Sequence, residues 1–388
     1  MKNTQGSPRT VFISDTTLRD GEQAPGVAFN QQYRMAIAQA LDDVGVDEIE
    51  IGFAASGPEH RRAMESVVKL GLKARLRSMA RPVREDILAA SDVGVSAVCI
   101  VLGFSQLHLQ HKLRISFDVA LECIVSATIL AKEQGLQVTV ALEDATRTSD
   151  RRVKQIVKSV SEVGADQISL ADTVGIGTPK LIRQKVRVAK QSTNIPIGLH
   201  CHDDFGLAII NSLTGIEAGG EFISSTFNRI GERAGNASTE CCVCALELLY
   251  GYKTNLRLSR LSEVAQMVSR YSGIGIPPNA PIVGSNAFRH ESGIHVSAML
   301  RDPRCYEAFD PSLFGAKRQF VLGKTSGRAG LRHFAAAEGV DLPDDLCDII
   351  LHRVKEMCDS EMGLQEGALR KLLQETVSLN SVASSTSS

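Results

Sequence analysis

Two histidines separated by one residue, His200 and His202, stand in the segment LHCHDDFGLA. If this segment is a β-strand, residues two apart point to the same face, so both imidazoles converge on one place. Converging imidazoles followed by two acids are typical ligands of a divalent metal ion, although a structural role for the pair is the alternative. Asn236, in NRIGERAGNAS, can add a carbonyl oxygen to the same ion. This set of ligands suits Zn, Mn, Mg or Co alike.

A charged cluster in the segment DTTLRDGEQAPG follows the first expected strand. It contains Arg19, Asp20, Glu22 and Gln23, and no helical pattern begins until about residue 30. A single acid at such a place often caps a helix. A whole charged cluster followed by a Pro-Gly turn is better explained by a functional site.

Polar residues also follow two later strands. Glu143 and Asp144 lie in LEDATRT, after the fifth expected strand. Thr173 lies in ADTVGIG, after the sixth, beside a glycine-rich loop that lets backbone approach a carboxylate closely.

The elements that must position these residues are eight short β-branched runs that alternate with amphipathic helical stretches. Strands are expected at 11–14, 48–53, 74–80, 97–103, 136–143, 166–172, 196–202 and 221–227. Several helical stretches end in the glycine that typically caps a helix before the next strand begins. Eight consecutive βα units predict an α/β fold with a closed (β/α)8 TIM barrel, and no G-x-G-x-x-G follows the first strand to favour an open sheet. In such a barrel the active site lies at the carboxyl ends of the strands, where the polar residues above fall.

The pattern changes after residue 275. The segment GIGIPPNAPIVGSNAF is rich in Gly and Pro, which is typical of a linker, and helical patterns return until about residue 376. We therefore expect a flexible N-terminus at 1–10, a catalytic barrel at 11–275, a linker and C-terminal helical subdomain or lid at 276–376, and a disordered tail at 377–388.

The composition excludes several classes of function. A net charge of -1 gives no electrostatic footprint for nucleic acid, and no apolar run is long enough to span a membrane. Nine cysteines without a secretory signal predict reduced thiols in the cytoplasm. We interpret the group Cys241, Cys242 and Cys244 as packed core thiols, because its spacing matches no common metal motif.

Seven motifs, taken in order, resemble those of the acetyl-CoA-dependent 2-oxo acid condensing enzymes. They are DTTLRDGEQAPG, LEDATRT, ADTVG, LHCHDDFGLA, GERAGNAS, HESGIH and VLGKTSG. This family includes the homocitrate, 2-isopropylmalate and citramalate synthases and, more distantly, hydroxymethylglutaryl-CoA lyase. The likeness covers about residues 10 to 330. It is greatest to the homocitrate synthases of nitrogen-fixing bacteria, on the segments GEQAPGVAF and HESGIHVSAMLRDP taken together.

The resemblance implies a role for each matching residue around the metal ion. The metal ligands would be Asp20, His200, His202 and Asn236. Arg19 would stabilise the alkoxide formed from the ketone of the 2-oxo acid, Thr173 would hold its C1 carboxylate, and Gln23 would lie beside the chelate.

The resemblance also implies the acid/base groups and the assembly. His295, the second histidine of HESGIH, would exchange protons with the reactants, with assistance from Glu143. In the family this segment reaches the active site of the neighbouring subunit, which implies a homodimer. Acetyl-CoA would be the co-substrate, and hydrolysis of the product thioester would make the condensation irreversible.

The identity of the 2-oxo acid depends on the third and fourth strands and their loops. Arg81 has counterparts across the family, whereas Arg77 replaces a usual apolar residue and could bind a distal anionic group. Ser105 and His108 match a recurrent S-x-x-H pattern, but Gln106 stands where Asp is common. We favour 2-oxoglutarate, which would give homocitrate. The alternatives are the isopropylmalate, citramalate and phosphonomethylmalate reactions; the first ranks lower because no C-terminal leucine-sensing domain follows.

Two hypotheses from other classes remain open. One is a lyase that cleaves a hydroxyacyl-CoA, which the HESGIH and GKTSG segments argue against because they are typical of the synthases. The other is a catalytically silent binding protein on the same barrel, which the intact set of charged residues argues against.

Overall fold

The computed structural model describes residues 9–360 and 367–376. Their contacts divide them into two compact units, with the boundary between Ile276 and Pro277. Most of the expected flexible N-terminus and the whole expected tail at 377–388 lie outside the described residues.

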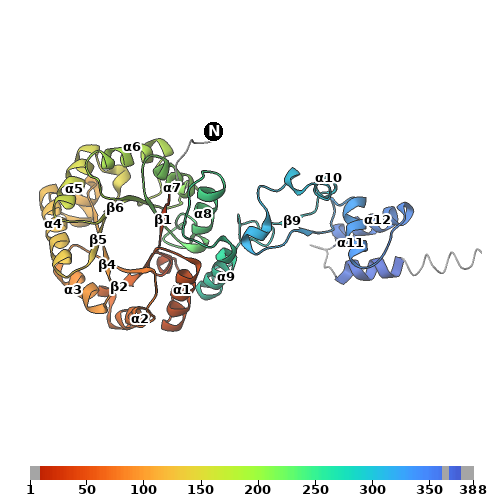
Figure 1. The fold of residues 1–388 in the computed structure, drawn as a ribbon, viewed down its shortest axis with the longest axis horizontal. Coiled ribbons are helices and arrows are strands. Elements are labelled where there is room, and N and C mark those ends of the chain that lie inside the picture. The colour runs from red at the N-terminus through yellow and green to blue at the C-terminus, as the bar shows by residue number, and fades with distance from the viewer. Residues whose placement is uncertain (1–8, 361–366, 377–388) are drawn as a thin grey trace, which may run out of the picture. The chain divides into compact units, whose positions relative to one another are not determined.

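The first unit is a closed barrel of eight parallel strands in sequential order, in which β1 pairs with both β2 and β8 (Figure 1). The strands are β1 Phe12–Asp15, β2 Glu48–Phe53, β3 Arg75–Ala80, β4 Ala97–Gly103, β5 Gln137–Glu143, β6 Gln167–Asp172, β7 Ile197–Cys201 and β8 Phe222–Ser225. The predicted TIM barrel is therefore confirmed, and each expected strand overlaps an observed one.

Helices surround this barrel on its outer side (Figure 1). They are α1 Gln31–Val44, α2 Pro58–Val68, α3 Arg84–Val93, α4 Phe117–Glu133, α5 Asp150–Glu162, α6 Pro179–Lys190, α7 Ala208–Glu217, α8 Thr239–Leu248 and α9 Leu261–Ser272. Local chemistry sets their ends. The side chain of Asn30 accepts a hydrogen bond from the backbone of α1, and Gly45 ends this helix in a left-handed conformation.

The interior of the barrel carries charged side chains among the apolar ones. Glu48, Glu50 and Arg77 are all at most 3% exposed. TIM-barrel interiors are usually filled by branched apolar residues, so these three charges require a local explanation.

The second unit has a short parallel pair of strands, β9 Arg289–His290 and β10 Gln319–Phe320, and the helices α10 Gly293–Met299, α11 Arg328–Ala337 and α12 Asp344–Ser360. Residues 367–376 are also helical. The expected helical region after the linker is therefore present. Its core is a cluster of leucines and other apolar residues from the last three of these helices, such as Leu331, Ile350 and Leu373.

The HESGIH and GKTSG segments form one local structure in this unit. The carboxylate of Glu291 accepts hydrogen bonds from the backbone and the hydroxyl of Thr325, and the hydroxyl of Ser326 donates to the carbonyl of Glu291. A side chain at Gly323 would collide with the Glu291 carboxylate. Glu291 therefore shapes these loops.

Among the described residues, none of the helices combines the length and apolarity needed to cross a bilayer. Cys242 and Cys244 on α8 are buried, as predicted for core thiols, and burial raises the pKa of both.

Candidate active site at the carboxyl ends of the barrel strands

A cavity of about 630 Å³ is lined by residues that lie in the barrel strands or in the loops after them. Nine of the residues singled out from the sequence line it: Arg19, Asp20, Gln23, Arg77, Arg81, Glu143, Thr173, His200 and His202. Five elements that are far apart in the sequence thus contribute expected residues to one cavity.

Asp20, His200 and His202 offer ligand atoms that all lie within 4.8 Å of one another. The Nε2 atom of His200 is 3.5 Å from the Asp20 carboxylate, and its Nδ1 atom is 3.2 Å from the hydroxyl of Ser224. Ser224 on β8 thus orients the imidazole from behind, as polar groups behind metal-binding histidines commonly do.

The charges of this cluster suit a divalent cation. Burial opposes ionisation of Asp20, but Arg19 at 2.7 Å and the two imidazoles outweigh it and hold the pKa of the carboxyl well below its usual value. Burial, reinforced by His200, lowers the pKa of His202 to about 4. At neutral pH the cluster therefore presents a carboxylate and a neutral imidazole.

Asn236 lies against the same cluster. Its Nδ2 atom donates to Asp20 at 2.8 Å and to the carbonyl of Ile230 at 3.1 Å. Its Oδ1 atom and the Nδ1 atom of His202 are buried without a hydrogen-bond partner. Buried polar atoms without partners are uncommon, so these two orphaned acceptors fit a site built for a cation.

A glycine of the GERAG segment permits this packing. A Cβ atom at Gly231 would lie 2.1 Å from Nδ2 of Asn236 and 2.7 Å from the Asp20 carboxylate, and the backbone has φ of +154°. The glycine thus lets the backbone approach the Asp20 and Asn236 side chains.

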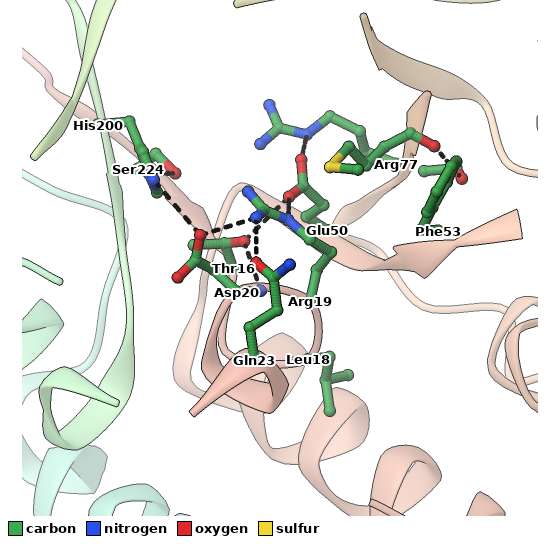
Figure 2. A network of polar contacts seen from close by, with 12 residues as sticks. Thr16, Leu18, Arg19, Asp20, Gln23, Glu50, Phe53, Arg77, His200 and Ser224 are labelled. Atoms are coloured by element: carbon green, nitrogen blue, oxygen red, sulfur yellow. Dashed lines mark hydrogen bonds and ion pairs between the residues drawn. The ribbon is translucent and has the colours of Figure 1, made fainter. Parts of the chain in front are cut away.

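A chain of alternating charges leads from the metal cluster into the barrel (Figure 2). Arg19 pairs with Asp20 and, through its Nε atom, with Glu50, and Glu50 lies between Arg19 and Arg77. Burial opposes ionisation of Glu50, but the two arginines outweigh it and lower its pKa to about 2. Burial likewise opposes the charge of Arg19, yet Glu50 and Asp20 raise its pKa. Both groups therefore remain charged throughout the physiological range.

Arg77 lines the cavity with its guanidinium held by two carboxylates. Its Nη1 atom is 2.5 Å from Glu48 and its Nε atom is 2.9 Å from Glu50. Sequence reasoning missed both glutamates. The sequence did carry a signal for them. Acids two residues apart, at 48 and 50, lie on one strand and are paired with arginines two residues apart, at 75 and 77, on the next strand.

Glu143 contacts a lysine that sequence reasoning also missed. The Nζ atom of Lys112 lies 2.7 and 2.6 Å from the two Glu143 oxygens, and both residues line the cavity. Lys112 belongs to the π-helical segment His108–Leu113, which ends at Arg114 in a left-handed conformation. Such irregular backbone has no sequence period, which explains why Lys112 escaped notice.

Three other expected residues line the cavity with distinct partners. The hydroxyl of Thr173 accepts a hydrogen bond from the backbone of Asp144, so its own hydrogen is free to donate. The side-chain carbonyl of Gln23 accepts from Arg19 at 3.1 Å. The guanidinium of Arg81 is largely exposed and pairs with Asp86.

Ser105 and His108 are placed differently. The buried Ser105 hydroxyl accepts from the backbone of His108, and the His108 ring lies 3.5 Å from Glu143 and 3.8 Å from Asp144. Neither residue is among those that line the cavity in the described part of the chain. They instead support the loop that carries Lys112.

His295 belongs to the second unit. It lies on α10, is exposed, and stacks on Tyr306 with ring centroids 3.9 Å apart.

Comparisons with known proteins identify the family of both units. Residues 10–268 match the HMGL-like family, and residues 282–362 match the family described as homocitrate synthase post-HMGL domain-like. Among similar proteins, the homocitrate synthase AksA of Methanopyrus kandleri is 42% identical over 95% of this chain and 93% of its own length. The 2-isopropylmalate synthase of Methanocaldococcus jannaschii is 39% identical over 95% of this chain and 72% of its own length.

Solved structures share the barrel. The HMG-CoA lyase of Bacillus subtilis has a TM-score of 0.64 at 20% identity and covers 70% of this chain and 97% of its own. At that identity the likeness concerns the fold alone. The sequence matches over both units show that this chain belongs to the HMGL-like family, in the branch of acetyl-CoA-dependent 2-oxo acid synthases that includes homocitrate, citramalate and isopropylmalate synthases.

Proposed function

We propose that the protein is a divalent-metal-dependent acyltransferase that condenses acetyl-CoA with 2-oxoglutarate to give homocitrate. The observation that carries this proposal is the cluster of Asp20, His200 and His202 beside the permanently charged Arg19 in the wall of one cavity. A ketone attacked by a carbon nucleophile develops negative charge on oxygen, and a metal ion and a guanidinium are the strongest stabilisers of that charge.

The 2-oxo acid would be held at its reactive end by this cluster. Asp20, His200 and His202, with Oδ1 of Asn236, would bind the metal, which supplies Lewis acidity to the ketone. The Thr173 hydroxyl, free to donate, would bind the C1 carboxylate, and Arg19 would stabilise the alkoxide. Gln23 holds Arg19 in place from the cavity side.

The acetyl methyl group must lose a proton before it can attack the ketone. Glu143 lies in the cavity wall as a candidate base, with Lys112 against its carboxylate. His295 would act with it, and in a homodimer the partner chain would supply this histidine. After condensation, water would hydrolyse the thioester and release CoA.

The distal part of the cavity favours two acceptors. Arg77 offers a cation for the second carboxylate of 2-oxoglutarate, and Arg81 lies at the rim. Met79, Val101 and Leu113 line the same cavity with apolar surface, which suits the short aliphatic tail of 2-oxoisovalerate or pyruvate. The isopropylmalate or citramalate reaction is therefore the second candidate.

The test is release of CoA from acetyl-CoA by purified protein with Mg or Mn, measured as free thiol. The acceptors are 2-oxoglutarate, 2-oxoisovalerate, pyruvate, oxaloacetate and phosphonopyruvate. We expect 2-oxoglutarate to be used most efficiently. Preference for another acid would replace the acceptor but keep the reaction class. Absence of release with every acid, from folded and metal-loaded protein, would refute the proposal.

A further inference from the structure

Glu48 on β2 is a buried carboxylate that neither the family motifs nor the proposed chemistry uses. It is 3% exposed and makes three contacts inside the barrel. Its Oε1 atom accepts from Nη1 of Arg77 at 2.5 Å and from the hydroxyl of Ser14 at 2.8 Å, and its Oε2 atom accepts from Nε of Arg75 at 2.6 Å. A buried carboxylate with three donors has its position closely fixed.

Glu48 in turn fixes the orientation of Arg77. Glu48 holds Nη1, and Glu50 lies 2.9 Å from Nε, so two of the three guanidinium nitrogens face carboxylates. Because the guanidinium is planar and rigid, these two contacts determine where the third nitrogen, Nη2, must point. Among the residues that the structure describes, Nη2 donates no hydrogen bond.

Space for a ligand exists beside Arg77. It lines the cavity together with Cys99 on β4, Ala141 on β5 and Ser169 on β6, all of them small side chains. Small residues on three successive strands leave the barrel interior open at this level, where a large apolar layer would otherwise fill it.

The charges of this region balance within the chain. Arg19, Arg75 and Arg77 carry three positive charges, and Asp20, Glu48 and Glu50 carry three negative ones, so Arg77 offers an anion the direction of its Nη2 donors and not an unbalanced charge. A buried positive charge is stabilised by an anion that reaches it, and a guanidinium whose Nη2 is free presents a directed donor to that anion.

We propose that Glu48 is a positioning residue that aims Arg77 into the cavity and so gives the enzyme its preference for a 2-oxo acid with a second anionic group. Glu48 itself touches no substrate; it acts through Arg77. This inference rests on the proposed function, because it concerns the acceptor of that reaction.

The test compares 2-oxoglutarate with 2-oxovalerate, a five-carbon 2-oxo acid that has a methyl group in place of the terminal carboxylate. The ratio of their affinities for the metal-loaded protein is measured by calorimetry, and the ratio of kcat/KM by thiol release. Glu48→Gln should lower both ratios by roughly tenfold, since a hydrogen bond to a charged group is at stake, while 2-oxovalerate is handled nearly as before. Arg77→Met should lower the ratios by about a hundredfold.

We expect these variants to fold. In Glu48→Gln, Arg77 keeps Glu50 as a partner, so no buried cation is left alone. The double variant Glu48→Gln/Arg77→Met removes both charges of the pair, and its ratio should equal that of Arg77→Met alone. Glu221→Gln is the matched control, because Glu221 pairs with Lys190 next to the opposite end of the strands, and its ratio should stay at the wild-type value.

The outcomes separate the hypotheses. An unchanged ratio in Glu48→Gln, or an equal loss for both acids, would overturn the role of Glu48. Additive losses in the double variant would also overturn it, because Glu48 would then act independently of Arg77. If wild-type protein binds 2-oxoglutarate no better than 2-oxovalerate, the inference fails even when CoA is released. Binding with a diacid preference but without CoA release would instead refute the proposed function and leave the anion subsite standing.

Discussion

Arg19 is the residue on which the proposed chemistry depends most, and its environment shows why a guanidinium is needed there. It bridges Asp20, which belongs to the proposed metal site, and Glu50, a buried acid whose pKa is lowered to about 2. Between two carboxylates it cannot lose its proton, so it can meet developing negative charge without changing its own protonation state.

At the metal cluster, His202→Ala should remove bound metal and abolish turnover, because His202 is one of three ligand side chains that converge within 4.8 Å. Metal content of the purified variant, measured by mass spectrometry, checks the first effect and thiol release the second. His352→Ala is the matched control, since His352 is an exposed histidine on α12 paired with Glu356. Full metal content in His202→Ala would refute the ligand assignment.

Asp15 gives a pH dependence of stability. Burial raises its pKa to about 7, although the backbone and hydroxyl of Thr17 donate to it. The folded state thus favours the protonated form. This contribution of Asp15 to the free energy of unfolding is fully present below about pH 4. It is lost as the pH rises through 7, and the total loss is up to about 4 kcal/mol.

In Asp15→Asn this loss should vanish. The free energy of unfolding of the variant, relative to wild type, should therefore increase between pH 5 and pH 8, as measured by denaturant titration at both values. A constant difference between the two proteins across this range would show that Asp15 does not titrate there.

The strands and helices were predictable because each carries its own signal. Strands such as 48–53 and 97–103 are β-branched runs, and glycines such as Gly45 and Gly94 end helices in the left-handed conformation. The eighth strand was expected to reach residue 227 but ends at Ser225, because Phe227 begins a turn in which Asn228 has φ of +57°. A turn of that kind depends on contacts made later in the chain, such as the bond from the Asn228 backbone to Glu240.

Parts of the candidate site could not be predicted from the sequence. The metal cluster was identified because its residues stand at strand ends in recognisable motifs. Glu48 and Glu50 lie within a strand, and only the pairing of β2 with β3 shows that they face Arg75 and Arg77. Ser105 and His108 were expected at the substrate; His108 lies 3.5 Å from Glu143 and Ser105 is bonded to the His108 backbone, and neither is among the residues that line the cavity in the described part of the chain.

The loop after β8 allows a test of how its backbone supports the site. Gly231→Ala should lower activity by more than tenfold, because the added methyl group would displace Asn236 or Asp20. Gly57→Ala is the matched control, since Gly57 has φ of +150° but open space around its Cβ position. Both variants should lose roughly 1–3 kcal/mol of stability from backbone strain, measured by thermal unfolding, and only Gly231→Ala should lose activity. Equal activity in the two would indicate that the close packing at Gly231 is dispensable.

At the scale of the whole molecule, the first unit carries the metal cluster and the second carries His295. The proposed homodimer predicts complementation between variants. Asp20→Ala and His295→Ala should each be inactive alone. When the two are unfolded together and refolded as an equal mixture, about half of the dimers should be heterodimers, and one of the two sites in each contains both residues. The mixture should therefore recover up to about a quarter of the wild-type activity expected for the amount of protein.

Size-exclusion chromatography of the mixture, with distinct tags on the two variants, verifies that heterodimers have formed. Heterodimers that remain inactive would argue that each chain supplies its own His295.

The ladder of Glu48, Arg77, Glu50 and Arg19 also bears on how such an enzyme can change over evolutionary time. Each charge in it has more than one partner. A substitution at Arg77 alone leaves Glu48 with Arg75 and Glu50 with Arg19, and a substitution at Glu50 alone leaves Arg77 with Glu48 and Arg19 with Asp20. If Arg77 selects the acceptor, as proposed, substitutions at these four positions would alter one another's effects, and acceptor choice would be an epistatic trait.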